Sequence, residues 1–477
     1  MIGRSAAKFF ERWFYEPKEF LIMIIEGAAH TESSNRRARY AAGKTLRKIV
    51  PRESLANFTP APNRNAAAII AETERDRIQS LLPLRRESMA KSPHAFLRGA
   101  ADVMAADLSA QPAPGIRAQV CGDCHLMNFG AFVSPEGHPL FDLNDFDETL
   151  PNVDATVDLR RFATSVVVAA LCAGKSERAS RSTARAALKA YRKAVTELAA
   201  VSPLQAWNTR VPLRDVLAEL RNRVLSAVAH AAQSARGDED DHADDFPKIS
   251  KGANGDLRIE DRPPRLFHFD ESIANQFDVN GLIAAAFANL PPHVAALLGR
   301  YRLSDIAFKA VGVGSLGTYC TIALFMSPDD EPLYIQVKEA KRSVLERFGL
   351  GVWPGVQGER VVRGQRMMQA ATDVFLGPTR DPASQREFYM RQLKTRRLGD
   401  LTELMQRHDL LDYAKLCGRT LARAHARSTD AAALAGYMGK SEAFDDALAS
   451  FAMLYAQQNA KDYEAFCKQG GAKPDRP

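Results

Sequence analysis

The hydrophobic pattern of this chain changes near residue 304, and that change limits the folds open to it. Upstream, apolar residues recur at helical spacing, most clearly over 157–174. Downstream, "DIAFKAVGVGSLGTYCTIALF" and "EPLYIQVKEAK" are rich in β-branched and aromatic residues with glycines between them, which predicts three antiparallel strands. A helix over 358–375, a strand in "EFYMRQL" and an amphipathic helix over 409–427 follow. The sequence therefore predicts an α+β fold with a helical part and a β-rich part.

Composition excludes several classes of protein. The 477 residues carry a formal net charge of +7, a mild basic tilt that fits a solvated surface or a cleft for phosphate-bearing ligands. No nucleic-acid-binding signature, signal peptide or apolar run of membrane-spanning length is visible, so we expect no nucleic-acid partner and no membrane partner. The six cysteines form no disulfide framework, which favours a cytoplasmic protein. The acidic run 237–245 is expected to be an exposed loop.

The stretch "VCGDCHLMNFG", residues 120–130, allows three interpretations. Cys121 and Cys124 followed by His125 match the attachment motif of c-type haem, and the two cysteines alone match a redox or metal pair. Asp123 and Asn128 match the D-x-x-x-x-N spacing of a kinase catalytic loop. Haem attachment requires an oxidising compartment, a structural zinc site requires four ligands, and a redox pair favours a βαβ context. The kinase interpretation fits the surrounding strands best.

That interpretation requires a second acidic residue for Mg²⁺, which prefers oxygen ligands. "FDLNDFDE" supplies Asp145 shortly downstream, and the following Phe146 distinguishes it from its neighbours Asp142 and Asp147. The alternative is a polar turn that caps the next helix. The sequence therefore predicts that Asn128 and Asp145 hold the metal ion.

A glycine-rich segment lies in the β-rich part. Gly312, Gly314 and Gly317 form G-x-G-x-x-G around Ser315, but a strand follows where a dinucleotide-binding fold requires a helix. Such a strand–turn–strand suits a flap over nucleotide phosphates. On the next strand, Leu333, Ile335 and Val337 share one face, and Tyr334, Gln336 and Lys338 share the other. A plain glycine-rich hairpin and a solvent-exposed lysine are the alternatives.

Five motifs together resemble the bacterial family called domain of unknown function 2252: "CGDCHLMNFG", "FDLNDFDETLPNVDATVDLRRFATS", "VGVGSLGTYC", "QVKEA" and "LARAHARS". They also look like the motifs of aminoglycoside phosphotransferases and related kinases, with Cys121 in place of a first histidine. By that likeness Asp123 is the catalytic base beside His125, and Asp158 braces the loop. Asn128 and Asp145 hold Mg²⁺. The ATP-binding residues would be Gly312, Gly314, Ser315, Gly317, Lys338 and, as carboxylate partner of the lysine, Glu359.

The order of these motifs is reversed relative to kinases, since the catalytic loop precedes the glycine loop. A circular permutation accounts for this, because permuted chains are tolerated when the original termini lie close together. The expected fold is thus a two-lobed, circularly permuted kinase-like fold with a β-rich nucleotide lobe and a helical lobe. The expected parts are a mostly helical N-terminal extension (1–110), the catalytic loop and helical lobe (111–300), the nucleotide lobe (301–397) and returning helices (398–477).

These motifs predict an ATP- and Mg²⁺-dependent phosphotransferase that acts on a hydroxyl or amine of a small-molecule acceptor. The sequence does not identify the acceptor or the oligomeric state. A nucleotide-binding pseudokinase or regulatory module and a nucleotidyl (AMP) transferase remain as alternatives. If the permutation is right, Lys338 must face the cleft of Asp145, the glycine hairpin must cover it, and the end of the 409–427 helix must lie near residues 111–119.

Overall fold

The β-rich part of the chain is a six-stranded antiparallel sheet. A computed structural model describes residues 34–219, 247–251, 257–268, 279–393 and 409–470, and the acidic run 237–245 lies outside these ranges. The strand order is β11-β12-β10-β9-β8-β7. The strands are β7 (Leu266–Phe267), β8 (Arg302–Lys309), β9 (Cys320–Met326), β10 (Pro332–Glu339), β11 (Gly377–Arg380) and β12 (Glu387–Gln392).

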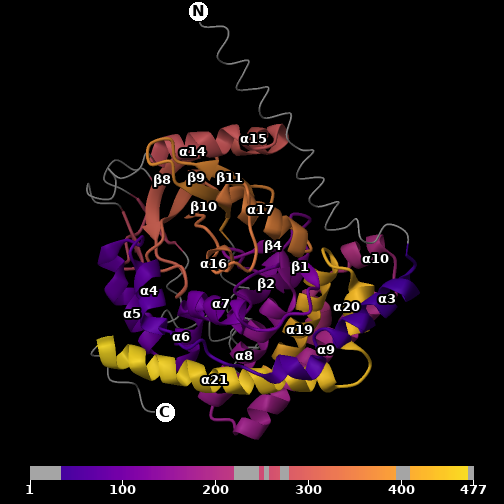
Figure 1. Cartoon of the computed structure of the whole chain (residues 1–477). Coiled ribbons are helices and arrows are strands. Elements are labelled where there is room, and N and C mark those ends of the chain that lie inside the picture. Colours follow the sequence, from indigo (N-terminus) through magenta and orange to yellow (C-terminus); the bar gives the residue numbers. More distant parts are fainter. Residues whose placement is uncertain (1–33, 220–246, 252–256, 269–278, 394–408, 471–477) are drawn as a thin grey trace, which may run out of the picture.

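The two faces of this sheet have different roles. Leu333, Ile335 and Val337 of β10 belong to one apolar cluster, which confirms the predicted alternation along this strand. Two helices, α14 (Val279–Ala288) and α15 (Pro292–Leu298), add their apolar side chains to the same cluster and lie over the sheet at the top of Figure 1. These two helices, which the expected division at residue 300 assigns to the helical lobe, thus pack on the sheet.

The helical body is built around α8 (Thr156–Cys172), which is buried along nearly its whole length. Helices α9 (Glu177–Leu198) and α21 (Ala443–Gly470) pack against it, and α19 (Leu410–Ala426) packs against α9. Helix α9 packs against α8, α19 and α21, and α21 runs along the bottom of the body in Figure 1. The observed α8 and α19 lie close to the helices that the hydrophobic periodicity predicted.

Two short strand pairs lie between the sheet and the helical body. Strand β1 (Arg117–Val120) pairs with β4 (Leu150–Asp154), and β2 (Phe129–Val133) pairs with β3 (Pro139–Leu143), both antiparallel. The sequence indicated strands around the loop of Asp123. Strand β2 was missed because its pattern is interrupted by Gly130 and is buried at most positions.

Helix α17 (Gln357–Met368) ends before the predicted limit of 375. The Met368 carbonyl accepts a hydrogen bond from Arg423 Nη2 at 2.8 Å, and Ala370 N donates to Asp142 Oδ2 at 2.7 Å. These bonds to other parts of the chain replace the next helical bonds. The short α16 (Val344–Arg347) precedes α17.

The N-terminal segment covers one side of the molecule with helices. Helix α3 (Arg36–Thr45) packs against α20 (Ala431–Met438), and helices α4 to α7 follow as an outer layer beside the sheet and body (Figure 1). Their bounds are α4 Ala66–Glu74, α5 Leu82–Ala90, α6 Pro93–Gly99 and α7 Ala101–Ser109. The remaining described elements are η1 Leu46–Lys48, η2 Arg52–Ala56, η3 Gln79–Leu81, η4 Leu126–Asn128, α10 Pro203–Asn208, α11 Leu213–Glu219, β5 Ile249–Lys251 and β6 Leu257–Ile259. Among the described helices, none combines the length and apolar character needed to cross a membrane.

Candidate functional site

A β-hairpin brings the two predicted metal ligands together. Strands β2 and β3 pair from Phe129 with Leu143, so the residues just outside the hairpin, Asn128 and Asn144, must also be neighbours. The backbone confirms this, because Asn144 N donates to the Asn128 carbonyl at 2.8 Å. Asp145 follows directly and lines the same cleft as Asn128.

Asp158 on α8 braces the backbone of the loop that carries Asp123. The two oxygens of this fully buried carboxylate accept hydrogen bonds from Cys121 N at 2.8 Å and Gly122 N at 2.9 Å, and His425 Nε2 lies 3.1 Å away. Gly122 has φ +83°, and a Cβ there would lie 2.2 Å from the carbonyl oxygen of Glu148. A side chain at position 122 would therefore distort the loop. Asp158 lies where a loop-bracing carboxylate was expected.

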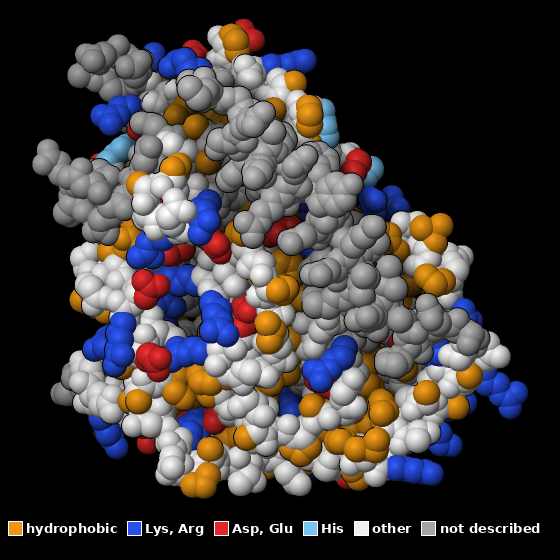
Figure 2. All heavy atoms as spheres, turned by 45° about the horizontal axis from the view of Figure 1, so that its top comes forward, with side chains coloured by type: hydrophobic (Ala, Val, Ile, Leu, Met, Phe, Trp, Pro, Cys, Tyr) orange, Lys and Arg blue, Asp and Glu red, His pale blue; other side chains and the backbone are white. Residues whose placement is uncertain are grey.

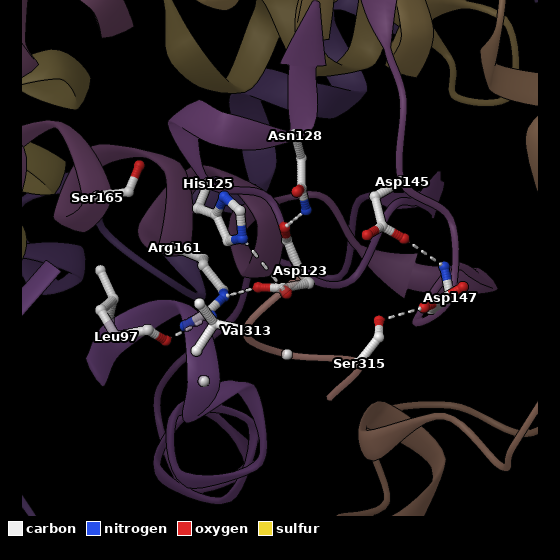
Figure 3. Close-up of polar contacts among 12 residues, drawn as sticks. Leu97, Asp123, His125, Asn128, Asp145, Asp147, Arg161, Ser165, Val313 and Ser315 are labelled. Atoms are coloured by element: carbon white, nitrogen blue, oxygen red, sulfur yellow. Dashed lines mark hydrogen bonds and ion pairs between the residues drawn. The ribbon is translucent and has the colours of Figure 1, made fainter. Parts of the chain in front are cut away.

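The carboxylate of Asp123 points into the cleft with one oxygen already bound (Figure 3). Arg161 Nε donates to Oδ1 at 2.5 Å, whereas His125 Nε2 is 3.6 Å from Oδ2, too far for a hydrogen bond. Burial raises the pKa of Asp123, and the charge of Arg161 opposes that rise. Oδ2 is therefore the oxygen that can accept a proton or position a hydroxyl group.

His125 is not built to act as an acid at neutral pH. Its side chain is almost fully buried, and Nδ1 has no hydrogen-bond partner among the described residues. Burial, reinforced by the charges of Arg98 and Arg161, holds the pKa of His125 well below its usual range. A neutral imidazole next to Asp123 shapes the loop and leaves the carboxylate free of a second ion pair.

The oxygens of Asn128 and Asp145 suit a hard cation. The Asn128 amide nitrogen donates to the Asp123 carbonyl, so its side-chain oxygen is the atom left for a ligand. Asp145 accepts the backbone N–H of Asp147 at 3.1 Å, and in Figure 3 its other oxygen faces Asn128 and Asp123. Two oxygen ligands from the protein, with phosphate oxygens and water completing the shell, are a typical Mg²⁺ arrangement. The residues present therefore fit this ion.

The first part of the glycine-rich segment borders the cleft, whereas Gly317, which the sequence also assigned to the nucleotide site, is not among the residues that line it. Gly312, Gly314 and Ser315 line it, and Figure 3 shows the backbone from Val313 to Ser315 passing close to Asp123. A Cβ at Gly314 would lie 3.3 Å from the Arg98 carbonyl and 3.9 Å from Asp123 Oδ2. A longer side chain at position 314 would fill the space in front of Asp123, which explains the need for glycine there.

The glycine-rich segment lies close to the other residues of the cleft and leaves little free space. Ser315 Oγ donates to Asp147 Oδ2 at 3.0 Å, and the free space in the cleft is about 110 Å³. Sites for small molecules usually measure ~300–1,000 Å³. A bound nucleotide would therefore require the segment to move away from Asp123.

Lys338 approaches from the sheet and contacts Asp147, which lines the cleft, but Lys338 itself is not among the lining residues, and the sequence paired it with a different carboxylate. Its ammonium group forms an ion pair with Asp147 Oδ2, and Tyr389 donates to Asp147 Oδ1 at 2.8 Å. Burial alone would raise the pKa of Asp147, but the Lys338 charge and hydrogen bond hold it below its usual range. The predicted partners were Asp145 and Glu359. Glu359 instead pairs with Arg363 one turn along α17 on a partly exposed face.

Sequence reasoning missed several residues of the site. Asp147 was considered only as a competitor of Asp145, although the pair Asp145 and Asp147, with one residue between them, could have suggested two roles. Arg161 follows Asp158 by one helical turn, a spacing that places both on one helix face. The N-terminal segment contributes Arg77, from the connection after α4, to the cleft, and no pattern in the sequence links this residue to the site.

Cys121 and Cys124 are packed inside the loop. Their sulfur atoms and a carboxylate oxygen of Asp158 lie within 4.8 Å of one another, a spacing that could suit a metal ion. Burial raises the pKa of both thiols, that of Cys124 to about 11, and Asp158 already accepts two backbone N–H groups. Metal-binding cysteines are thiolates. These cysteines therefore serve as small buried side chains under the loop.

The end of α19 lies beside β1. Ser428 lies two residues beyond the helix, and its Oγ accepts a hydrogen bond from Gln119 N of the strand at 2.8 Å. The end of the C-terminal motif "LARAHARS" therefore contacts the strand that leads into Asp123.

The fold and the cleft define a mixed α+β protein whose polar site lies between a covered antiparallel sheet and a helical body. The chain belongs to the family described as an uncharacterized protein conserved in bacteria, domain of unknown function 2252, whose model matches residues 77–469. Comparisons with curated proteins and with solved structures found no match.

Proposed function

We propose that this protein is a phosphotransferase that uses ATP and Mg²⁺ to modify a hydroxyl or amine of a small molecule. One observation carries the proposal. Lys338 and Ser315 both contact Asp147, across 191 and 168 sequence positions, in the cleft that holds Asp123, Asn128 and Asp145. Residues that suit phosphate binding, metal binding and hydroxyl positioning therefore converge from opposite ends of the domain.

The finer fold assignment belongs to the same proposal. A circularly permuted kinase-like arrangement is supported by the hydrogen bond between Gln119 and Ser428, because an unpermuted chain would run from α19 directly into β1. It is also supported by the position of the sheet, because Lys338 on one of its faces contacts Asp147 in the loop that follows Asp145. All six cysteines are free, which suits the cytoplasmic location that we propose for the reaction.

In this proposal each residue of the cleft has one task. Asn128 and Asp145 would hold Mg²⁺, which supplies charge neutralisation for the transferred phosphoryl group. Asp123 Oδ2 would accept a hydrogen bond from the acceptor hydroxyl and take its proton, while Arg161 fixes the carboxylate through Oδ1. Lys338 would exchange its contact with Asp147 for nucleotide phosphates when the glycine segment moves.

A nucleotide-binding module without turnover is the second candidate, and the ion pair between Arg161 and Asp123 favours it. A carboxylate already paired with a guanidinium group is a weaker base than a free one. Turnover distinguishes the two functions.

The test is a screen of small-molecule pools for ATP consumption by the wild-type chain and by Asp123→Asn. We expect at least one pool to accelerate ADP formation in the wild type and not in the variant. Mass spectrometry of the acceptor then separates a phosphoryl adduct from an AMP adduct. ATP·Mg²⁺ binding without turnover in every pool would favour the regulatory module, and absence of both binding and turnover would refute the proposal.

A further inference from the structure

The N-terminal helices give the cleft an arginine-rich wall, which the proposed reaction leaves without a role. Arg77, Arg85 and Arg98 line the cleft from the N-terminal segment, together with the single carboxylate of Asp102 on α7. On the opposite side the lining includes Asp145 and Glu148. Figure 2 shows Lys and Arg side chains interleaved with Asp and Glu side chains on the left, the side of α4 and α5.

Arg77 is the least neutralised of the three cations. Its Nη1 donates to the Leu316 carbonyl at 2.6 Å, and its buried Nε has no hydrogen-bond partner. Within the described part of the chain, no carboxylate lies within ion-pair distance of it. Burial therefore lowers the pKa of Arg77, since the nearest acidic groups only partly offset the loss of hydration. A largely buried guanidinium group that forms no ion pair is costly even when more distant carboxylates partly offset its charge, and a bound anion would relieve that cost.

Arg85 and Arg98 extend the same positive wall. Arg85 is only 1% exposed, and its Nε also has no hydrogen-bond partner, with Glu74 Oε1 3.8 Å away. Its remaining nitrogens donate to the carbonyls of Val313 at 2.6 Å and Gly99 at 2.7 Å, which orients the group beside the glycine segment. Arg98 contributes a positive charge that helps lower the pKa of His125.

We propose that this wall is a phosphate-binding subsite, in which Arg77 is the principal ligand and Arg85 and Arg98 add charge. The planar guanidinium fork matches two oxygens of a phosphate group, and the acidic wall opposite would face the metal ion. The phosphate has two possible sources, the terminal group of a nucleotide or a phosphate carried by the acceptor. The assignment to one of these sources rests on the proposed function, whereas phosphate binding itself does not.

The test uses inorganic phosphate alone, without metal or nucleotide, and follows its binding by ³¹P line broadening. We expect the wild type to bind phosphate with a dissociation constant of about 10 mM or tighter. Arg77→Gln should weaken binding at least ~10-fold, a loss of about 1.4 kcal/mol. The matched control is Arg75→Gln, because Arg75 is an exposed neighbour just beyond α4 and does not line the cleft. The control should bind like the wild type.

A second measurement on the wild type does not depend on how the variants fold. Phosphate should slow amide hydrogen exchange around Arg77 and in residues 312–317, because both segments border the subsite. Absence of phosphate binding, equal binding by the two variants, or protection confined to other segments would overturn the proposal.

The source of the phosphate is read from nucleotide affinities. If the wall binds the terminal phosphate, Arg77→Gln should weaken ATP·Mg²⁺ binding more than ADP·Mg²⁺ binding. If it binds the acceptor, both nucleotides should bind as to the wild type. If phosphate binding depends on Arg77 but neither nucleotide binds the wild type, the phosphate subsite is supported and the phosphotransferase function is refuted.

Discussion

Removing Asp147 from its ion pair with Lys338 should destabilise the protein more than removing Lys338. The Lys338 side chain is almost completely buried in the sheet, whereas 22% of the Asp147 side chain is exposed. Asp147→Asn leaves a buried ammonium group without its counter-charge and should lower the free energy of unfolding by about 3–5 kcal/mol. Lys338→Met should cost less, about 1–3 kcal/mol, because Asp147 keeps the hydroxyls of Ser315 and Tyr389 and part of its hydration.

The pH dependence of this difference follows from the two pKa shifts. The pKa of Asp147 is held low, so its contribution is present above its unfolded value of about 4 and is lost as pH falls through the folded value. The pKa of Lys338 is raised by Asp147 despite the opposing effect of burial, so its contribution is complete below about 10 and is lost only at higher pH. The difference between the variants should therefore be constant from about pH 6 to 8.

The assay is urea unfolding at three pH values within that range, with the double variant completing a mutant cycle. Asp145→Asn is the matched control in the same turn and should change stability by less than about 0.5 kcal/mol, since it forms no ion pair with a described residue. Equal losses for Asp147→Asn and Lys338→Met, or a control as damaging as either, would refute the assigned burial of the pair.

Three further predictions concern the loop. Asp123→Asn should abolish turnover while ATP·Mg²⁺ affinity changes less than about threefold, because the residue acts in the chemical step. Enzyme kinetics measure turnover and calorimetry measures affinity, and equal losses of both would mean that Asp123 has a structural role. Arg161→Met should move the acidic limb of the kcat/KM profile upward by about 1–2 pH units, since the guanidinium group opposes the raised pKa of Asp123; an unmoved limb would contradict that role. Cys124→Ala should lower stability by about 1 kcal/mol and leave turnover nearly intact, whereas lost activity at unchanged stability would restore a chemical role for the thiol.

Local patterns carried much of the fold. The alternation along β10 placed Lys338 on the correct face because a strand has a strict two-residue period. Apolar residues at the spacing of a helical turn likewise located α8 and α19. The D-x-x-x-x-N spacing placed Asp123 and Asn128 in one loop, and the hairpin that follows accounts for Asp145.

The parts that sequence reasoning missed depend on contacts between distant segments. The partner of Lys338 is set by how the sheet docks on the loop, so Asp147 and Glu359 could not be distinguished by spacing. The end of α17 is set by Arg423, which is far away in the chain. Arg85 and Arg98 lie on helices α5 and α6, and Arg77 lies in the connection after α4, so only the folded chain brings the three arginines together at the cleft.

The most direct test of the phosphotransferase account is binding of ATP with Mn²⁺ in place of Mg²⁺, followed by water proton relaxation. The account predicts a wild-type dissociation constant of about 1 mM or tighter and at least a ~10-fold loss in Asp145→Asn, because Asp145 supplies a metal ligand. The Glu359→Gln control should bind as the wild type does, since Glu359 pairs with Arg363 and does not line the cleft. Absence of binding by the wild type, or equal binding by Asp145→Asn, would contradict the account.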